Sequence, residues 1–235
     1  MATEAFIFDY GGTLDSRGEH WSRVIRRGYS AAGLEPDEEH FRQAYVHGER
    51  TLARLPIVKP TDNFLELMRK KVSVELQWLD ENNLLHDIPV EQTCDKIARY
   101  CYDSARECVA ESRAVLDAVR LKGIPMVLVS NFYGNIHSVL ADFGIEGYFS
   151  EIIESAVVGV RKPDPQIFAL GVNALGLPPE KVTVVGDSYS KDILPALTLG
   201  CRAIWLRGPG WTTDDDTKVY ADSIHSITEL PNVAF

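Results

Sequence analysis

The stretch "FIFDYGGTLDS", from Phe6 to Ser16, decides the fold of this chain. It opens with a short apolar run bounded by turn residues, which is typical of a buried strand. The strand ends at Asp9, and Gly11 and Gly12 follow almost at once. Glycines at such a turn let the backbone approach a ligand closely and direct N–H groups at an anion. The stretch therefore predicts a buried strand that delivers an acidic side chain to an anion-binding turn.

Further apolar runs of the same kind recur along the chain. They are "PMVLVS" (125–130), "VTVVGD" (182–187) and "AIWL" (203–206), with a weaker one at "IIESAVV" (152–158). Helical patterns separate them, and several of these end in glycine, as the C-termini of helices prefer. Near-continuous apolar strands that alternate with helices favour a parallel sheet covered on both faces. We therefore expect an α/β core of three layers.

Residues 16–110 have a different character. They hold amphipathic helical stretches and no strong buried-strand run, and a proline-rich joint, "LPIVKPTDN" (55–63), separates two of these stretches. Such a joint fits a loop between helices. We expect residues 1–15 and 111–235 to form the core, and residues 16–110 to form an all-helical domain inserted after the first strand.

Composition and charge limit the classes of function. A chain of 235 residues is long enough for one domain that carries an inserted one. Its net charge of −10 argues against a nucleic-acid or anionic-membrane surface. No apolar stretch approaches the roughly 20 residues that cross a bilayer, and the N-terminus lacks the pattern of a secretory signal. Four cysteines do not make a disulfide scaffold in a chain of this length, so we expect a cytoplasmic protein. The sequence does not predict its oligomeric state.

Chemically useful side chains follow the predicted strands. In open parallel sheets, ligands bind beyond the carboxyl ends of the strands. That rule brings together side chains far apart in the sequence, namely Asp9, Ser130, Asn131, Lys162, Asp187 and Asp192. We therefore expect three carboxylates, a hydroxyl and an ammonium group to face one crevice.

The chemistry of this set is specific. Neighbouring carboxylates repel unless a cation lies between them, and ligands that are all oxygens favour Mg²⁺. Such an ion keeps Asp9 ionised, hence nucleophilic, and neutralises an incoming phosphoryl group. Ser130 and Lys162 can donate to the phosphoryl oxygens. The net negative charge of the chain does not oppose a phosphorylated substrate, because a metal ion inverts the local field.

The ordered motifs resemble those of the haloacid dehalogenase-like hydrolase superfamily, in its helical-cap type. The motifs are Asp9-Tyr10-Gly11-Gly12-Thr13, then Ser130, then Lys162-Pro163, then Gly186-Asp187 through Asp192. The likeness covers nearly the whole chain. It implies a Rossmann-like core in residues 1–15 and 111–235, and a helical cap in residues 16–110.

The resemblance also implies a role for each matching residue. Asp9 corresponds to the nucleophile of the family, and Ser130 and Lys162 to the residues that orient the transferred group. Asp187 corresponds to a Mg²⁺ ligand together with Asp9 and the backbone carbonyl of Gly11, with Asp192 as close support. The residues expected to contact the phosphate are Tyr10, Gly11, Ser130, Asn131 and Lys162.

One position departs from the family pattern. Its phosphatases usually read Asp-x-Asp-x-Thr, where the second Asp is the general acid and base, and here that position is Gly11. A positioned general acid contributes typically 10²–10⁴-fold, so its absence costs roughly 2.7–5.4 kcal/mol of barrier. Attack on a phosphomonoester with a poor alkoxide leaving group would suffer most, and an acyl phosphate would suffer less.

The alternative is that another residue replaces the missing acid. Asp15, Glu19 and His20 follow closely in sequence and are near enough to reach the site with the cap. His20 has the most suitable unperturbed pKa, although a surface histidine that starts a cap helix is the favoured interpretation. Such caps close over small substrates, exclude water and set specificity. Tyr133 and Asn135 are further candidates to touch the ligand.

The leading prediction is a Mg²⁺-dependent phosphatase or phosphoryl-transfer enzyme. It would act on a small phosphorylated metabolite through an aspartyl-phosphate at Asp9. One alternative from the resemblance is cleavage of a carbon–halogen bond, in a branch that carries Tyr in place of the second Asp, whereas Tyr10 stands one position early. Another is cleavage of a carbon–phosphorus bond by a cap lysine, for which the candidates without any local signature are Lys59, Lys70, Lys71 and Lys96. A third is a metal- and phosphate-binding protein that has lost turnover.

Overall fold

The structure is a computed structural model that describes residues 3–85, 88–211 and 217–234. A six-stranded sheet forms its centre, in the strand order β3-β2-β1-β4-β5-β6, and every neighbouring pair is parallel. The strands are β1 (Ala5–Phe8), β2 (Met126–Ser130), β3 (Glu151–Glu154), β4 (Val182–Gly186), β5 (Arg202–Leu206) and β6 (Ser223–Ile224). The predicted parallel α/β sheet is confirmed.

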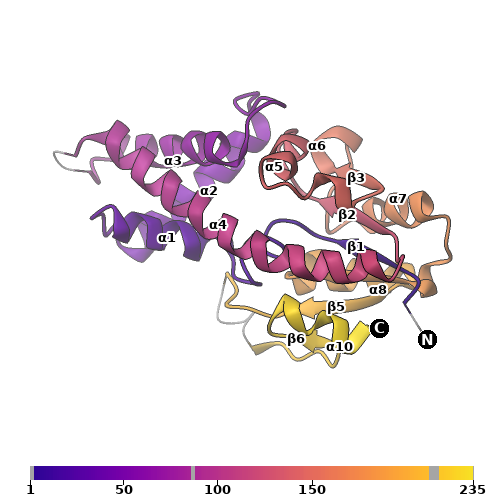
Figure 1. The fold of residues 1–235 in the computed structure, drawn as a ribbon. Helices are drawn as coiled ribbons and strands as arrows, with labels where there is room; N and C mark the ends of the chain where they lie inside the picture. The colour runs from indigo at the N-terminus through magenta and orange to yellow at the C-terminus, as the bar shows by residue number, and fades with distance from the viewer. Residues whose placement is uncertain (1–2, 86–87, 212–216, 235) are drawn as a thin grey trace.

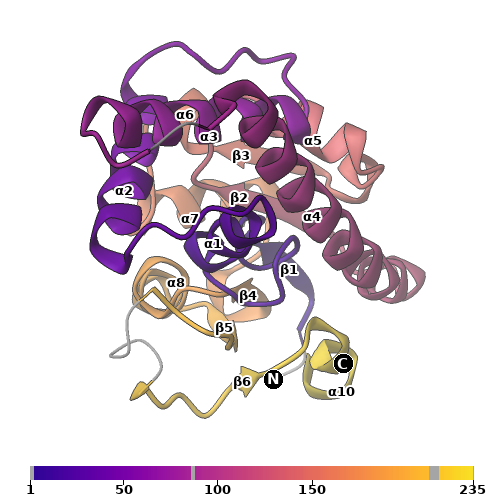
Figure 2. The same cartoon turned by 90° about the vertical axis from the view of Figure 1, so that its left-hand side faces the viewer.

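The two faces of the sheet pack into separate buried clusters, because successive side chains of a strand point to opposite faces. Phe6 and Phe8 of β1 lie in one cluster with Leu116, while Ile7 lies in the other with Phe168. Helices cover both faces (Figure 2): α4 (Val90–Leu121) and α10 (Leu230–Ala234) on the first, and α7 (Gln166–Leu175) and α8 (Leu194–Leu199) on the second. This is the three-layer arrangement that the sequence predicts.

The weaker strand pattern at 152–158 corresponds to a strand only in its first part. β3 ends at Glu154, and a short helix, α6 (Ser155–Val158), begins at the next residue. Gly159 ends that helix with a left-handed φ of 73°, a conformation that glycine adopts without steric cost. The remaining short elements are α5 (Ile136–Asp142), single helical turns at Glu146–Tyr148, Pro179–Lys181 and Ile227–Glu229, and a π-helical turn at Tyr189–Ile193.

Between β1 and β2 the described residues form helices and no strand. They are α1 (Trp21–Ala31), α2 (Glu38–Arg54), α3 (Phe64–Glu81) and the first part of α4, which lie together at one end of the molecule (Figure 1). A capping box starts α3, in which Asn63 and Glu66 each accept a hydrogen bond from the other's backbone N–H, and this satisfies amide groups that a helix N-terminus leaves unpaired. We use the word cap for residues 16–110, and this division of the chain stays a proposal.

Helix α4 is shared by the two parts of the molecule. It is a single helix of 32 residues that runs across the expected boundary between residues 110 and 111. Its first part packs against α1 and α3, while Leu116 and Val119 join the buried cluster that contains Phe6 and Leu128. The cap is therefore joined to the core by a continuous helix as well as by the segment that follows β1. Among the described helices none is long and apolar enough to span a membrane.

Candidate active site

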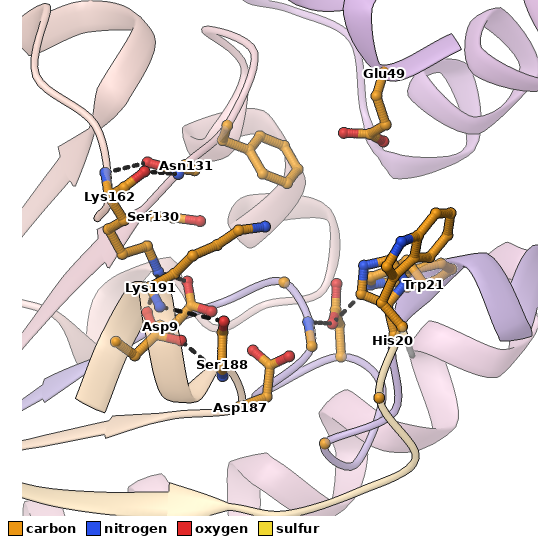
Figure 3. A pocket seen from close by; sticks show the side chains of 18 of the residues that line it. Asp9, His20, Trp21, Glu49, Ser130, Asn131, Lys162, Asp187, Ser188 and Lys191 are labelled. Atoms are coloured by element: carbon orange, nitrogen blue, oxygen red, sulfur yellow. Dashed lines mark hydrogen bonds and ion pairs between the residues drawn. The ribbon is translucent and has the colours of Figure 1, made fainter. Parts of the chain in front are cut away.

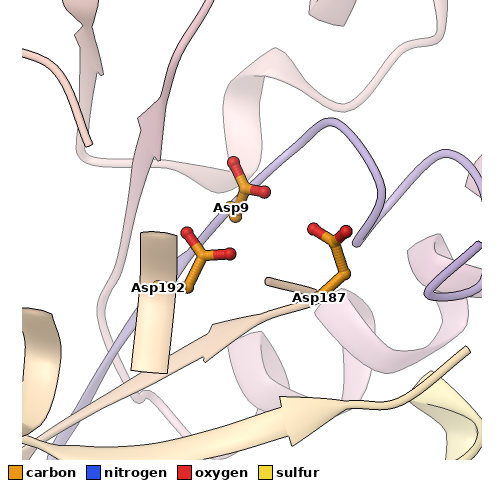
Figure 4. Close-up of side chains that lie close together, drawn as sticks. All are labelled: Asp9, Asp187 and Asp192. Atoms are coloured by element: carbon orange, nitrogen blue, oxygen red, sulfur yellow. The ribbon is translucent and has the colours of Figure 1, made fainter. Parts of the chain in front are cut away.

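Three carboxylates, two of them buried and that of Asp187 half-buried, meet beyond the carboxyl ends of two neighbouring strands (Figure 4). Asp9 follows β1, Asp187 follows β4, and Asp192 lies in the π-helical turn after β4. One carboxylate oxygen of each residue lies within 4.8 Å of those of the other two. β1 and β4 are paired in the sheet, with Phe8 opposite Val185, and this register places the two strand ends side by side.

Lys162 contacts this cluster with its ammonium group. Among the described residues, no other ammonium group forms an ion pair with these three carboxylates. The Nζ of Lys162 lies 2.6 Å from Oδ1 of Asp9 and 2.7 Å from Oδ1 of Asp192, and its side chain is only 3% exposed. Burial alone would lower the pKa of Lys162, but the charges of Asp192 and Asp9 raise it well above its usual value. Lys162 is therefore a permanent cation at the bottom of the site.

One ammonium does not balance three carboxylates. Burial raises the pKa of Asp187 well above its usual value, and the charges of Asp9 and Asp192 raise it further. Thr13 adds a hydroxyl that lies 3.3 Å from Oδ1 of Asp187 and 3.4 Å from Oδ2 of Asp9. A close group of oxygen ligands with excess negative charge is the environment that a hard divalent cation such as Mg²⁺ favours, so this donor set fits the ion.

The structure requires glycine at only one of the two glycine positions in the first motif. Gly12 has a φ of +97°, and a Cβ there would lie 2.3 Å from Cγ of Asp187, so the turn accepts no side chain at this position. Gly11 has neither restraint: a Cβ built on it meets nothing within 4 Å. The backbone therefore does not force the absence of an acid at position 11.

A cavity of about 630 Å³ lies between the core and the cap, and the acidic cluster is part of its wall. Figure 3 shows Ser130, Lys162 and Asp187 on the core side, and Glu49 of α2 facing them from the cap. Ser130 is buried at the end of β2 and lines the cavity. Thus the structure gathers the side chains of the four predicted motifs in one place.

Two residues that were predicted to contact the phosphate, Tyr10 and Asn131, make other contacts in the structure. The side chain of Tyr10 is fully buried, packs edge-on against Phe132 with a centroid distance of 5.7 Å, and is not part of the cavity wall. The side chain of Asn131 lines the cavity but is engaged by the backbone of Lys162, donating to its carbonyl at 3.0 Å and accepting from its N–H at 2.9 Å. Asn131 thereby fixes the loop that carries Lys162, and its contact with phosphate stays a prediction.

Of the three candidates for the missing acid, Asp15 has the environment of a proton donor. It is 1% exposed and lines the cavity. Its Oδ1 accepts hydrogen bonds from the Gly12 N–H at 2.7 Å and the Trp21 indole at 3.0 Å, whereas Oδ2 has no hydrogen-bond partner. Burial raises the pKa of Asp15 to about 7, with a smaller contribution from the charge of Asp9, against the lowering effect of the two hydrogen bonds.

The other two candidates are occupied differently. The carboxylate of Glu19 is held by the guanidinium of Arg27, with one contact of 2.7 Å, and is not part of the cavity wall. His20 lines the cavity but serves as the N-cap of α1, where its Nδ1 accepts from the Ser22 N–H at 3.2 Å. The expectation that His20 starts a cap helix is confirmed.

Sequence reasoning missed a second charged cluster, on the cap side of the cavity. Lys71 of α3 is buried and forms ion pairs with Glu49 and, at 3.5 Å, with Glu75. Its Nζ also lies 4.2 Å from the ring centre of Tyr45. The available signal was that Lys71 and Glu75 occupy the apolar stripe of α3, where a charged side chain requires a buried partner.

The same cluster bears on the lysines that carbon–phosphorus cleavage would use. Among Lys59, Lys70, Lys71 and Lys96, only Lys71 is found in the wall of the described cavity. Burial alone would lower its pKa, but the charges of Glu49 and Glu75 raise it above the usual value. An imine-forming lysine must lose its proton, so this environment opposes that chemistry.

Comparisons with known proteins agree on one family. A family model described as haloacid dehalogenase-like hydrolase matches residues 3–200. Phosphoserine phosphatase from Thermus thermophilus is 34% identical over 97 residues, which are 41% of this chain and 39% of that protein. Haloacid dehalogenase-like hydrolase domain-containing protein 3 from Danio rerio is 30% identical over 155 residues, which are 64% of this chain and 57% of that protein. The chain thus spans between about two fifths and three fifths of these relatives.

A solved structure resembles the whole chain. The putative HAD-hydrolase YfnB from Bacillus subtilis, solved with bound magnesium, has a TM-score of 0.60 and is 15% identical, and the match covers 100% of this chain and 99% of that one. At this identity the likeness shows the fold alone.

Proposed function

The chain belongs to the haloacid dehalogenase-like hydrolases, and on that premise we propose that it is a Mg²⁺-dependent phosphatase of small phosphorylated metabolites. The observation that carries the proposal is the position of the Asp9 carboxylate, which lies in the cavity wall in contact with Lys162 and close to the carboxylates of Asp187 and Asp192. The sequence similarity to a phosphatase over part of the chain supports the same class of reaction.

In the proposed first step, a carboxylate oxygen of Asp9 attacks phosphorus. The bond from phosphorus to the leaving oxygen breaks, and an aspartyl-phosphate forms. Lys162 and Ser130 orient the phosphoryl oxygens, and the charge of Lys162 stabilises the negative charge that spreads over them. Mg²⁺, held by Asp9, Asp187 and the Gly11 carbonyl, would supply further positive charge at the phosphoryl group.

Asp15 would manage the proton in both steps. With a pKa of about 7, a substantial fraction of its carboxyl groups carries a proton at neutral pH, and that proton passes to the leaving alkoxide. The resulting Asp15 carboxylate then accepts a proton from the water that attacks the aspartyl-phosphate. The bond between phosphorus and Asp9 breaks, inorganic phosphate leaves, and both side chains return to their starting states. General acids work best with a pKa near the working pH.

The cavity limits the class of substrate. A volume of about 630 Å³ suits a small metabolite. Asp15 stands four residues beyond Gly11, so its contact with the leaving group differs from the one that a carboxylate at position 11 would make. Substrates with a good leaving group, such as acyl phosphates, need that contact least and are expected to react fastest.

The experiment is an assay of the purified protein with Mg²⁺ on a panel of phosphate monoesters and acyl phosphates. Asp9→Asn should abolish release of phosphate, and an exposed carboxylate of the cap, Asp103, gives the matched control Asp103→Asn. Reduction with borohydride during turnover should convert the phosphorylated Asp9 into homoserine, which mass spectrometry detects. No turnover of any compound and no modification at Asp9 would favour the binding protein that has lost catalysis.

A further inference from the structure

The cap side of the cavity presents one carboxylate to whatever lies between it and Asp9. Glu49 lines the cavity, its side chain is 40% exposed, and Figure 3 shows its carboxyl end directed from α2 toward the core side. One oxygen, Oε1, accepts a hydrogen bond from Tyr133 at 2.9 Å and pairs with Lys71. The other oxygen, Oε2, has none of the hydrogen bonds or ion pairs found among the described residues.

The buried groups behind Glu49 hold it in place. Lys71 lies between Glu49 and Glu75, and Tyr29 donates to Oε2 of Glu75 at 3.2 Å. α2 and α3 approach closely at this point, since a Cβ on Gly48 would lie 2.9 Å from Cγ of Glu75. The carboxylate is therefore fixed before any ligand binds, which reduces the entropy lost on binding.

The charge state of Glu49 is also fixed. Burial would raise its pKa, but the charge of Lys71 and the hydrogen bonds from Lys71 and Tyr133 lower it below the usual value. An ionised carboxylate accepts hydrogen bonds and donates none. Lys71 also pairs more closely with Glu49 than with Glu75, whose Oε1 lies 3.5 Å from its Nζ.

We propose that Glu49 is a specificity-determining residue that binds a hydrogen-bond donor, an ammonium or hydroxyl group, at the end of the substrate remote from the phosphate. This proposal rests on the proposed function, because it assigns the phosphate to the end of the cavity with Lys162 and Ser130. The cavity wall also includes the apolar side chains of Trp21, Phe64, Leu67 and Met68, which suit a short carbon chain. A second anionic group at the Glu49 end would meet a fixed like charge.

Exposed cations also border the cavity, and the charge of one of them, Lys191, helps to lower the pKa of Glu49. Arg50, Arg161 and Lys191 also line it, but all three are exposed, and water and salt screen such charges. Glu49 differs from them because two buried or partly buried donors hold it in one position.

The test compares three phosphate esters that differ only at the far end: ethanolamine phosphate, ethylene glycol phosphate and propyl phosphate. In the unaltered protein, kcat/KM should be highest for the two donors. Glu49→Gln keeps the size and the acceptor for Tyr133 but removes the charge. It should lower kcat/KM roughly 10- to 100-fold for ethanolamine phosphate, mainly through KM, less for the glycol ester, and not at all for the propyl ester.

A control and a binding measurement keep the outcomes distinct. Glu38→Gln changes an exposed carboxylate in the first turn of the same helix and should leave all three substrates unaffected. Calorimetry of the same esters against the Asp9→Asn protein and against Asp9→Asn combined with Glu49→Gln reports the contact without turnover. If Glu49→Gln weakens binding of the three esters equally, the proposal is overturned. If no ester turns over but the binding preference for the donors is seen, the phosphatase proposal fails and this one stands.

Discussion

The indole Nε1 of Trp21 donates a hydrogen bond of 3.0 Å to Oδ1 of Asp15, and this bond links the first helix of the cap to the turn that follows Asp9, the proposed nucleophile. The turn itself supplies the second donor, the N–H of Gly12. Both bonds favour the ionised carboxyl, and burial opposes them more strongly. The position of the cap helix therefore influences the proton affinity of the group that we assign as general acid.

Replacement of Asp15 by Asn should remove the general acid and keep the two accepted hydrogen bonds. We expect kcat for an alkyl phosphate to fall roughly 10²–10⁴-fold, with a much smaller effect on acetyl phosphate, whose leaving group needs no proton. Steady-state kinetics on the two substrates measures the difference. Equal losses on both would mean that Asp15 has a structural role only.

Replacement of Trp21 by Phe should shift the pH dependence without removing the acid. The hydrogen bond from Trp21 lowers the pKa of Asp15 in the unaltered protein. Its removal should therefore raise that pKa. Because the protonated form is the active one, the decline of kcat at alkaline pH should move to higher pH. A profile from pH 5 to 9 measures the shift, and movement toward lower pH would contradict the assignment.

Asp15 should also make stability depend on pH. Its pKa rises from 3.8 in the unfolded chain to about 7 in the folded protein, so the unfolded chain releases the proton first. The free energy of unfolding therefore falls as the pH rises from about 4 through 7. The free energy of unfolding of Asp15→Asn minus that of the unaltered protein should therefore increase by about 2–3 kcal/mol from pH 5 to pH 8. Urea denaturation in buffer with a metal chelator measures this gain, and a difference that does not change with pH would rule it out.

The residues on the core side of the site could be predicted from the sequence for a simple physical reason. Apolar strands of a parallel sheet end at one edge, so Asp9, Ser130 and Asp187 had to lie near one another once the strands were recognised. The position of Lys162 depends on a loop, and there the ordered motifs supplied what strand patterns do not.

The contacts on the cap side of the site could not be predicted from the sequence in the same way. The contact between Glu49 and Tyr133 joins the cap to the core, and no periodicity reports how one packs on the other. Similarly, the chain near residues 110 and 111 has no helix-breaking residue to reveal whether one helix or two is present, and α4 continues through it. The choice among Asp15, Glu19 and His20 depended on burial, which the sequence leaves open at a turn.

Magnesium should stabilise the protein, and the effect should grow with pH. Protons and Mg²⁺ compete for the carboxylates, because burial and like charges raise the pKa of Asp187 and of Asp192. A ligand that binds only the folded state raises stability in proportion to the logarithm of its concentration over its Kd. Thermal denaturation with 5 mM Mg²⁺ is therefore expected to give a larger rise in Tm at pH 8 than at pH 5. Asp187→Asn should abolish the rise and Asp103→Asn should keep it; a rise that persists in Asp187→Asn would place the ion elsewhere.

The substitution Gly11→Asp should restore a carboxylate where the structure leaves room for one. A Cβ at position 11 meets nothing within 4 Å, whereas at position 12 it would collide with Asp187. We expect Gly11→Asp to fold normally and to raise kcat for alkyl phosphates at least tenfold, since a positioned acid contributes 10² or more, with little change for acetyl phosphate. Gly11→Ala is the matched control for the added Cβ, and Gly12→Ala should lose Mg²⁺ stabilisation. If Gly11→Asp lowers activity while Gly11→Ala does not, a second carboxylate harms the site, and the glycine is an adaptation to the natural substrate.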